Sequence, residues 1–90
     1  MQTSRRFVIS GRVQGVGFRY FVQSIAVREA VVGWVRNLDD GRVEVYAIGP
    51  ANKISDLAAA LHKGPMLSDV RGVEEQEAAA GRYSNFQIEV

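Results

Sequence analysis

The residues with the clearest capacity for chemistry lie in one short segment, Gly11 to Arg19, which reads GRVQGVGFR. Its alternating first half predicts a strand, and its glycine-rich second half predicts a tight turn into a helix. Backbone N–H groups in such a turn, together with the free N–H groups and positive dipole end of a helix N-terminus, bind phosphate or carboxylate. The guanidinium of Arg19 can complete this anion-binding site. Gly15 and Gly17 make the turn feasible, because a β-carbon at either position would disfavour a positive φ.

A plainer interpretation of the same segment has equal support from its residues alone. Glycines between a strand and a helix often serve only to turn the chain. Two familiar nucleotide-binding loops are excluded by inspection, since no Gly-x-x-x-x-Gly-Lys-Ser/Thr motif is present and Tyr20 stands where a third glycine would follow Gly15 and Gly17. The segment is thus either a structural turn or a site for a small anion, and a nucleotide site is disfavoured.

Asn37 is the second candidate for chemistry. The strand before it is expected to lie beside the first strand, with Asn37 near the hairpin end. Its amide both donates and accepts hydrogen bonds, which suits it to position a water molecule. Asparagines near hairpins commonly satisfy backbone groups of the turn instead, and the pattern alone favours that structural role.

The composition excludes several other kinds of site. The 90 residues include no cysteine and a single histidine, His62. Without cysteine there is no thiolate nucleophile, disulfide, zinc finger or iron–sulfur centre, and one histidine cannot form a histidine pair. His62 lies near the end of a predicted helix, where the helix dipole favours it.

Charge and hydropathy narrow the class of partner. Arginines at positions 5, 6, 12, 36 and 42 suggest nucleic acid, but the net charge is only +1 and the strand over 43–46 lacks the RNA-recognition signature. RNA binding is therefore a minor alternative. No apolar run approaches the roughly 20 residues of a membrane span, and no signal core follows the N-terminus. We expect a cytoplasmic protein with no membrane or nucleic-acid partner.

The spacing of apolar residues predicts the elements that position these candidates. Alternation is typical of strands and a 3.6-residue spacing of helices. Asp40-Gly41 predicts a hairpin, and Gly64-Pro65 is expected to stop the second helix. In chain order we expect a strand over 7–13, a helix over 19–29, strands over 31–36 and 42–48, a helix around 54–61, a weaker strand over 68–76 and a last strand over 86–90.

The order of these elements predicts one α+β domain over residues 1–90. It is the βαββαβ order of a ferredoxin-like sandwich, in which two helices cover one face of an antiparallel sheet. The run near residue 70 is expected to be the fourth strand, with a bulge because Val70 and Val73 break alternation, and the last strand a short edge. This fold serves RNA binding, metal binding and catalysis alike, so function must be argued from the site.

Other conspicuous residues have structural interpretations. Aromatic side chains beside valines are more often core than cofactor contacts, which predicts core positions for Phe18, Tyr20, Phe21 and Trp34. The acidic run over 74–77 has no histidine or further carboxylate at ligand spacing, so we expect a solvated face.

Taken together, several segments resemble the acylphosphatase family over essentially the whole chain. They are GRVQGVGFR at 11–19, GWVRN at 33–37, DGRVE at 40–44, GP at 49–50 and YSNFQI at 83–88. The resemblance implies the ferredoxin-like fold and hydrolysis of the carboxyl-phosphate bond of small-molecule acyl phosphates, with inorganic phosphate as a product. It implies no metal or other cofactor and a monomeric enzyme.

The resemblance also implies roles for individual residues. Arg19 would bind the phosphate oxygens and Asn37 would orient the attacking water. The phosphoryl group would be cradled by the backbone N–H groups of Gln14, Gly15, Val16, Gly17, Phe18 and Arg19. The leaving group is a carboxylate whose conjugate acid has a pKa of about 4, so no general acid is needed.

Two residues depart from the family pattern. Leu38 stands where many members carry a threonine, which removes a supporting hydroxyl. Ala30 stands where a glycine is common, and a left-handed backbone there would cost about 1 kcal/mol. A non-catalytic module of the same fold that binds anions or a protein partner is the alternative function, and an RNA-binding module comes third.

Overall fold

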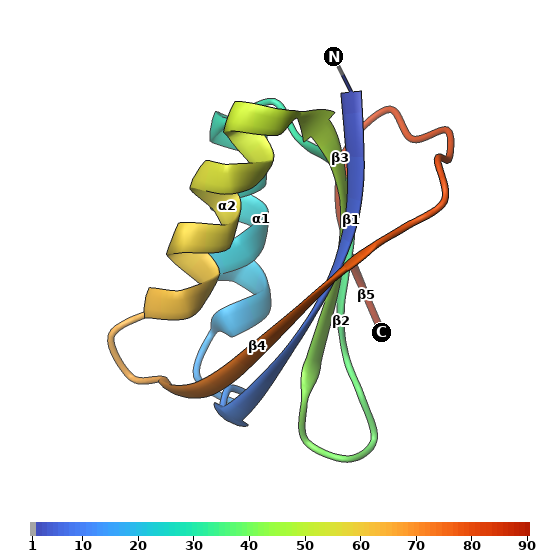
Figure 1. Ribbon diagram of the computed structural model, residues 1–90. Helices are drawn as coiled ribbons and strands as arrows, with labels where there is room; N and C mark the ends of the chain where they lie inside the picture. Colours follow the sequence, from blue (N-terminus) through green and yellow to red (C-terminus); the bar gives the residue numbers. More distant parts are fainter. Residues whose placement is uncertain (1) are drawn as a thin grey trace.

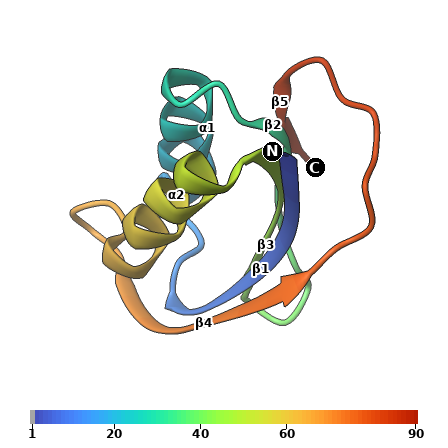
Figure 2. The same cartoon turned by 45° about the horizontal axis from the view of Figure 1, so that its top comes forward.

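In the computed structural model, which describes residues 2–90, two helices pack against one face of a five-stranded sheet (Figures 1 and 2). In chain order the elements are β1 (Gln2–Arg12), α1 (Phe18–Arg28), β2 (Val32–Asn37), β3 (Val43–Pro50), α2 (Ala51–Lys63), β4 (Asp69–Glu77) and β5 (Phe86–Glu89). All the predicted elements are present. The first strand begins earlier than predicted. Its first residues are polar and pair with β3 through the backbone, so they show no alternation of apolar residues from which a strand could be predicted.

The ferredoxin-like fold class is confirmed, with a mixed sheet in place of the expected antiparallel one. The strand order is β4-β1-β3-β2-β5, so the last strand lies at an edge as predicted. Every neighbouring pair is antiparallel except β2 and β5, which are parallel. The reason is the segment 78–85, which carries the chain from one sheet edge to the other and reverses it once, as Figure 2 shows.

The core lies between the sheet and the two helices. Alternate residues of the central strands point inward, among them Phe7 and Ile9, and meet the apolar stripes of α1 and α2. The buried cluster comprises Phe7, Ile9, Val13, Phe18, Val22, Ile25, Ala26, Val31, Val35, Val43, Val45, Ala47, Ile54, Leu57, Leu61 and Phe86. The predicted bulge is also present: Ser10 pairs with Gly72 and Gly11 with Val70, which leaves Arg71 of β4 unmatched.

The aromatic residues divide between the core and the surface. Phe18 is buried as predicted, and Phe21 packs against the core with its ring centroid 6.0 Å from that of Phe18. The prediction for Tyr20 is wrong, since 71% of it is exposed. Residues two apart on a helix point to opposite sides, so Tyr20 faces away from the core that Phe18 enters. Trp34 is half-buried on the helix-free face, where it packs on Tyr46.

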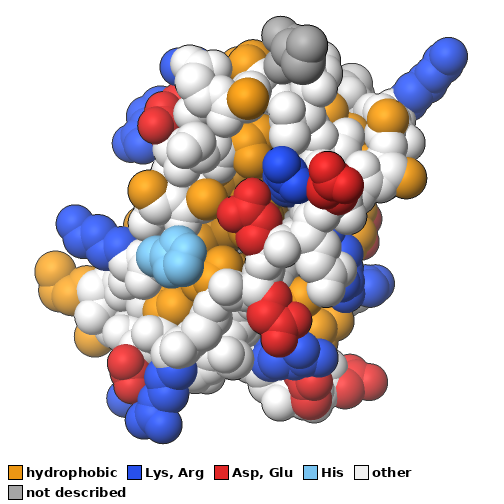
Figure 3. Space-filling model, in the orientation of Figure 1, with side chains coloured by type: hydrophobic (Ala, Val, Ile, Leu, Met, Phe, Trp, Pro, Cys, Tyr) orange, Lys and Arg blue, Asp and Glu red, His pale blue; other side chains and the backbone are white. Residues whose placement is uncertain are grey.

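The surface carries both signs of charge. On the face seen in Figure 3, acidic and basic side chains are interspersed. Glu74, Glu75 and Glu77 are exposed, as predicted, and Arg5 forms ion pairs with the last two. His62 is exposed in the last turn of α2, also as predicted. Neither helix within residues 2–90 is long and apolar enough to span a bilayer.

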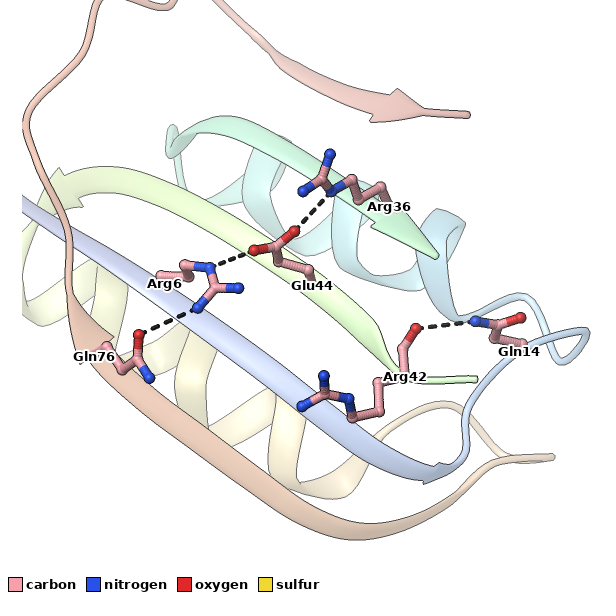
Figure 4. Close-up of polar contacts among 6 residues, drawn as sticks. All are labelled: Arg6, Gln14, Arg36, Arg42, Glu44 and Gln76. Carbon is pink, nitrogen blue, oxygen red and sulfur yellow. Dashed lines mark hydrogen bonds and ion pairs between the residues drawn. The ribbon is translucent and has the colours of Figure 1, made fainter. Parts of the chain in front are cut away.

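A buried carboxylate organises the helix-free face of the sheet (Figure 4). Glu44 is 3% exposed and accepts hydrogen bonds from Nε of Arg36, at 2.7 Å, and from Nε of Arg6. Arg6 also donates to Gln76, and Arg36 lies over the ring of Trp34. Burial raises the pKa of Glu44, but the hydrogen bonds and charges of Arg36 and Arg6 outweigh it and hold that pKa below its ordinary value.

Ala30 has the left-handed backbone that its departure from the family pattern put in question. Its φ is 58° at the end of α1. The N–H of Val31 donates to the carbonyl of Ala26 at 2.8 Å, and the N–H of Ala30 to that of Val27 at 3.2 Å. This pair of bonds is the Schellman motif, whose left-handed position favours glycine.

Replacing Ala30 by glycine is therefore expected to raise the free energy of unfolding by about 1 kcal/mol, which is roughly 4–8 °C in Tm for a domain of this size. Differential scanning calorimetry measures this. Ala59, exposed within α2, is a matched control, because glycine there should lower stability by about 1 kcal/mol. An unchanged or lower Tm for Ala30→Gly would contradict the strain.

Glu44 should make stability fall in acid. Because the pKa of Glu44 is lowered in the folded protein, its contribution to stability is present above the unfolded pKa of about 4.3. That contribution is lost as the pH falls below this value and through the lower folded pKa. Glu44→Gln should cost about 1–2 kcal/mol at pH 7, and the difference from wild type should shrink as the pH falls in this way. Urea unfolding at each pH measures it. Glu74→Gln, on an exposed position, should change stability by less than about 0.5 kcal/mol, and an equal effect would refute the role of Glu44.

Candidate active site

Two glycines shape the loop that joins β1 to α1. Gly15 has φ 73° and Gly17 has φ 78°, a left-handed conformation that side chains other than glycine rarely adopt. Gly17 is the N-cap of α1, and Val16 between the two glycines packs against the core. The loop is thus anchored at one apolar side chain while its backbone turns around it.

The start of α1 has free backbone donors. No side chain caps it, and its first turn contains no acidic residue. The first backbone bond at this end runs from the N–H of Phe21 to the carbonyl of Gly17, at 3.0 Å. The N–H groups of Phe18, Arg19 and Tyr20 therefore have no helical partner, and the positive end of the dipole is not neutralised locally.

These groups border a cavity of about 110 Å³ that also includes the end of β2. Its lining residues are Val13, Gly15, Gly17, Phe18, Arg19, Tyr20 and Asn37. The sheet register explains this meeting, because Ile9 of β1 and Asn37 of β2 both pair with Val43 of β3. Because both strands are antiparallel to β3, they run in the same direction, and their C-terminal ends lie at the same end of the sheet.

The cavity unites most of the residues singled out by the sequence. Gln14 and Val16 belong to the same loop but do not line it. Tyr20 does line the cavity, but the sequence analysis did not identify it as a site residue. Its position at the helix start could have indicated this, since the third N–H of a helix is as free as the first two. Two larger hollows, of about 590 and 430 Å³, flank the segment 78–84 and contain no residue of the loop.

Arg19 is held at the cavity by the last strand. Its Nη1 donates to the backbone carbonyl of Glu89 in β5, at 3.3 Å. Within residues 2–90, none of the ion pairs involves Arg19, so its charge is not neutralised by a carboxylate. A half-buried guanidinium beside free backbone donors is suited to bind a small anion.

Asn37 lies between two hollows. Besides the first cavity it lines a second one of about 310 Å³, together with Arg36, Leu38, Asp39 and Val90. The hydrogen bond from the N–H of Leu38 to the carbonyl of Arg42, at 2.8 Å, closes the hairpin just beyond Asn37. Asn37 is thus fixed at the end of a paired strand, with space on both sides.

Comparison with known proteins gives a consistent result. The family model for acylphosphatase matches residues 5–88. An acylphosphatase of Solibacter usitatus is 59% identical over 85 residues, which are 94% of this chain and 88% of that protein. The crystal structure of acylphosphatase from Bacillus subtilis has a TM-score of 0.95 at 41% identity, covering all of both chains.

A second solved structure agrees. An acylphosphatase from Coxiella burnetii has a TM-score of 0.94 at 36% identity, over 98% of this chain and 93% of that one. The resemblance first seen in the glycine loop and the GWVRN segment thus holds over most of the sequence and for the whole fold. With the family model spanning nearly the whole chain, this protein belongs to the acylphosphatase family, hydrolases that act on acyl phosphates.

Proposed function

We propose that this protein hydrolyses small-molecule acyl phosphates at the cavity shared by the glycine loop, Arg19 and Asn37. The products are a carboxylate and inorganic phosphate. The observation that carries the proposal is that one cavity of about 110 Å³ is lined both by free donors of a helix start and by a neutral amide from another strand. An anion-binding module needs the first of these features, whereas hydrolysis also needs a group that can orient water.

The phosphoryl group binds between the guanidinium of Arg19 and the loop N–H groups. Phosphoryl transfer depends chiefly on positioning and on stabilising charge spread over the equatorial oxygens. Preorganised N–H donors and one arginine supply this stabilisation without reorganising during the reaction. The hydrogen bond from Arg19 to the carbonyl of Glu89 supports a fixed guanidinium.

Asn37 orients the attacking water in line with the leaving oxygen. The water oxygen forms a bond to phosphorus while the bond from phosphorus to the acyl oxygen breaks, and the carboxylate leaves with the electron pair. The water's proton passes to a phosphate oxygen or to solvent. The hollow on the other side of Asn37 supplies a route for water to this position.

The remaining expectations stay predictions. The reaction as proposed needs no metal ion, because Arg19 and the loop N–H groups carry the charge stabilisation. The sequence and its family resemblance lead us to expect a monomer in the cytoplasm with no nucleic-acid or membrane partner. Hydrolysis assayed in excess chelator tests the independence from metal ions directly.

Arg19→Ala is expected to lower kcat/KM for benzoyl phosphate by about a hundredfold or more, because losing one preorganised donor costs about 3 kcal/mol in the transition state. The loss of ultraviolet absorbance on hydrolysis, followed in excess chelator, measures it. Arg82→Ala removes an exposed arginine that does not line the cavity, and it should leave kcat/KM unchanged. A folded wild-type protein without turnover would point to the anion-binding module instead.

Asn37→Ala is expected to lower kcat by about a hundredfold while changing the inhibition constant of inorganic phosphate little, since water positioning is lost and the phosphate donors remain. Steady-state kinetics with phosphate as competitor separates the two quantities. Asn52→Ala, at an exposed position in the first turn of α2, is the matched control. If Asn37→Ala weakened phosphate inhibition as much as Arg19→Ala does, the water-positioning role would be wrong.

A further inference from the structure

The side chain of Gln14 turns away from the cavity and reaches the β2–β3 hairpin. Its Nε2 donates to the carbonyl of Leu38 at 2.8 Å and to the carbonyl of Arg42 at 2.9 Å. Figure 4 shows Gln14 directed at Arg42 from the loop that follows β1. Both partners are carbonyls, which only accept hydrogen bonds, so both hydrogens of the amide nitrogen are used.

The two acceptors stand at the closing point of the hairpin. Leu38 and Arg42 are joined by the backbone bond that ends the ladder, and Leu38 directly follows Asn37. Gln14 therefore ties the phosphate-binding loop to the peptide unit next to the water-orienting side chain. Within residues 2–90, the hydrogen bonds joining loop 13–17 to hairpin 38–42 are these two alone.

Apart from Gln14, the loop is held by apolar packing, since Val13 is buried in the core and Val16 packs against it. Gly15 and Gly17 have no side chains to pack, and a β-carbon at either would meet no other group within 4 Å. The pairing of β1 with β3 ends at Ile9 and Val43, and its pairing with β4 ends at Arg12, so no strand pairing joins the loop to the hairpin. The hydrogen bonds that fix the loop relative to the strand end at Asn37 are therefore those of the Gln14 amide.

We propose that Gln14 is a positioning residue, whose side chain sets the distance between the bound phosphoryl group and the water held by Asn37. This inference rests on the proposed function. Its physical basis is that in-line attack tolerates little displacement, and a shift of about 1 Å can cost on the order of a hundredfold in rate. The role is separate from that of the Gln14 backbone N–H, which methionine or glutamate at this position retains.

The test uses Gln14→Met, which keeps the length of the side chain but removes both donors. We expect kcat for benzoyl phosphate to fall about tenfold or more, with the inhibition constant of inorganic phosphate changing less than about threefold. Gln14→Glu should lose activity likewise, since a carboxylate cannot donate to two carbonyls. It also provides a second variant if Gln14→Met does not fold.

Gln23→Met is the matched control. Gln23 also donates from Nε2 to a backbone carbonyl, that of Phe86 at 3.1 Å, but from α1 to β5 and away from the loop. Its substitution should leave kcat within about twofold of wild type. A similar fall in kcat in both variants would show that loss of any such bond slows the enzyme, and would overturn the assignment to Gln14.

A double variant separates positioning from a general loss of structure. In the Asn37→Ala background, adding Gln14→Met should lower kcat less than about twofold, because there is no longer a side chain to misplace. Multiplying effects, or a folded Gln14→Met protein with wild-type kcat, would overturn this inference alone. Absence of turnover in the wild-type protein would instead overturn the proposed function, and this inference with it.

Discussion

The candidate site depends on the hydrogen-bond register of the three central strands. β1 and β2 both pair antiparallel with β3, and Ile9 and Asn37 both meet Val43. Because these two strands must then run in the same direction, the loop after β1 and the last residue of β2 come to the same end of the sheet. The free start of α1 and the amide of Asn37 line one cavity only because both lie where these two strands end.

Under the proposed function, the start of α1 gives up stability in favour of binding an anion. A side-chain cap would contribute about 1 kcal/mol, and an acidic first turn would add a favourable interaction with the dipole. Both are missing here, and left-handed Gly17 occupies the capping position. The unpaired N–H groups and Arg19 form a positive region that no ion pair within residues 2–90 neutralises. The apolar stripe of α1, which includes Val22 and Ile25, stabilises the helix that this start leaves uncapped.

On the helix-free face of the sheet, two arginines stabilise a buried carboxylate. Glu44 lies in the central strand β3, where a carboxylate without partners would be strongly unfavourable. Arg36 and Arg6, from the strands on either side, donate to its two oxygens. Arg36 also lies over the ring of Trp34, which packs on Tyr46. This arrangement joins three strands side by side on the face that has no helices. It also leaves Arg36 paired with a carboxylate, in contrast to Arg19, whose charge remains available at the cavity.

The sequence by itself determined what depends on neighbours in the chain. The glycine turn, the helix start, the hairpin at Asp40-Gly41 and the alternation that buries Phe7 and Ile9 follow from local conformational preferences and periodicity, and so the fold class could be predicted. Only the tertiary structure decided which groups meet across long stretches of chain: the parallel β5, the burial of Glu44, and the two bonds by which Gln14 reaches carbonyls 24 and 28 residues away. Local patterns carry no record of these contacts, because each arises from the register of strands and the packing of loops rather than from the residues beside it.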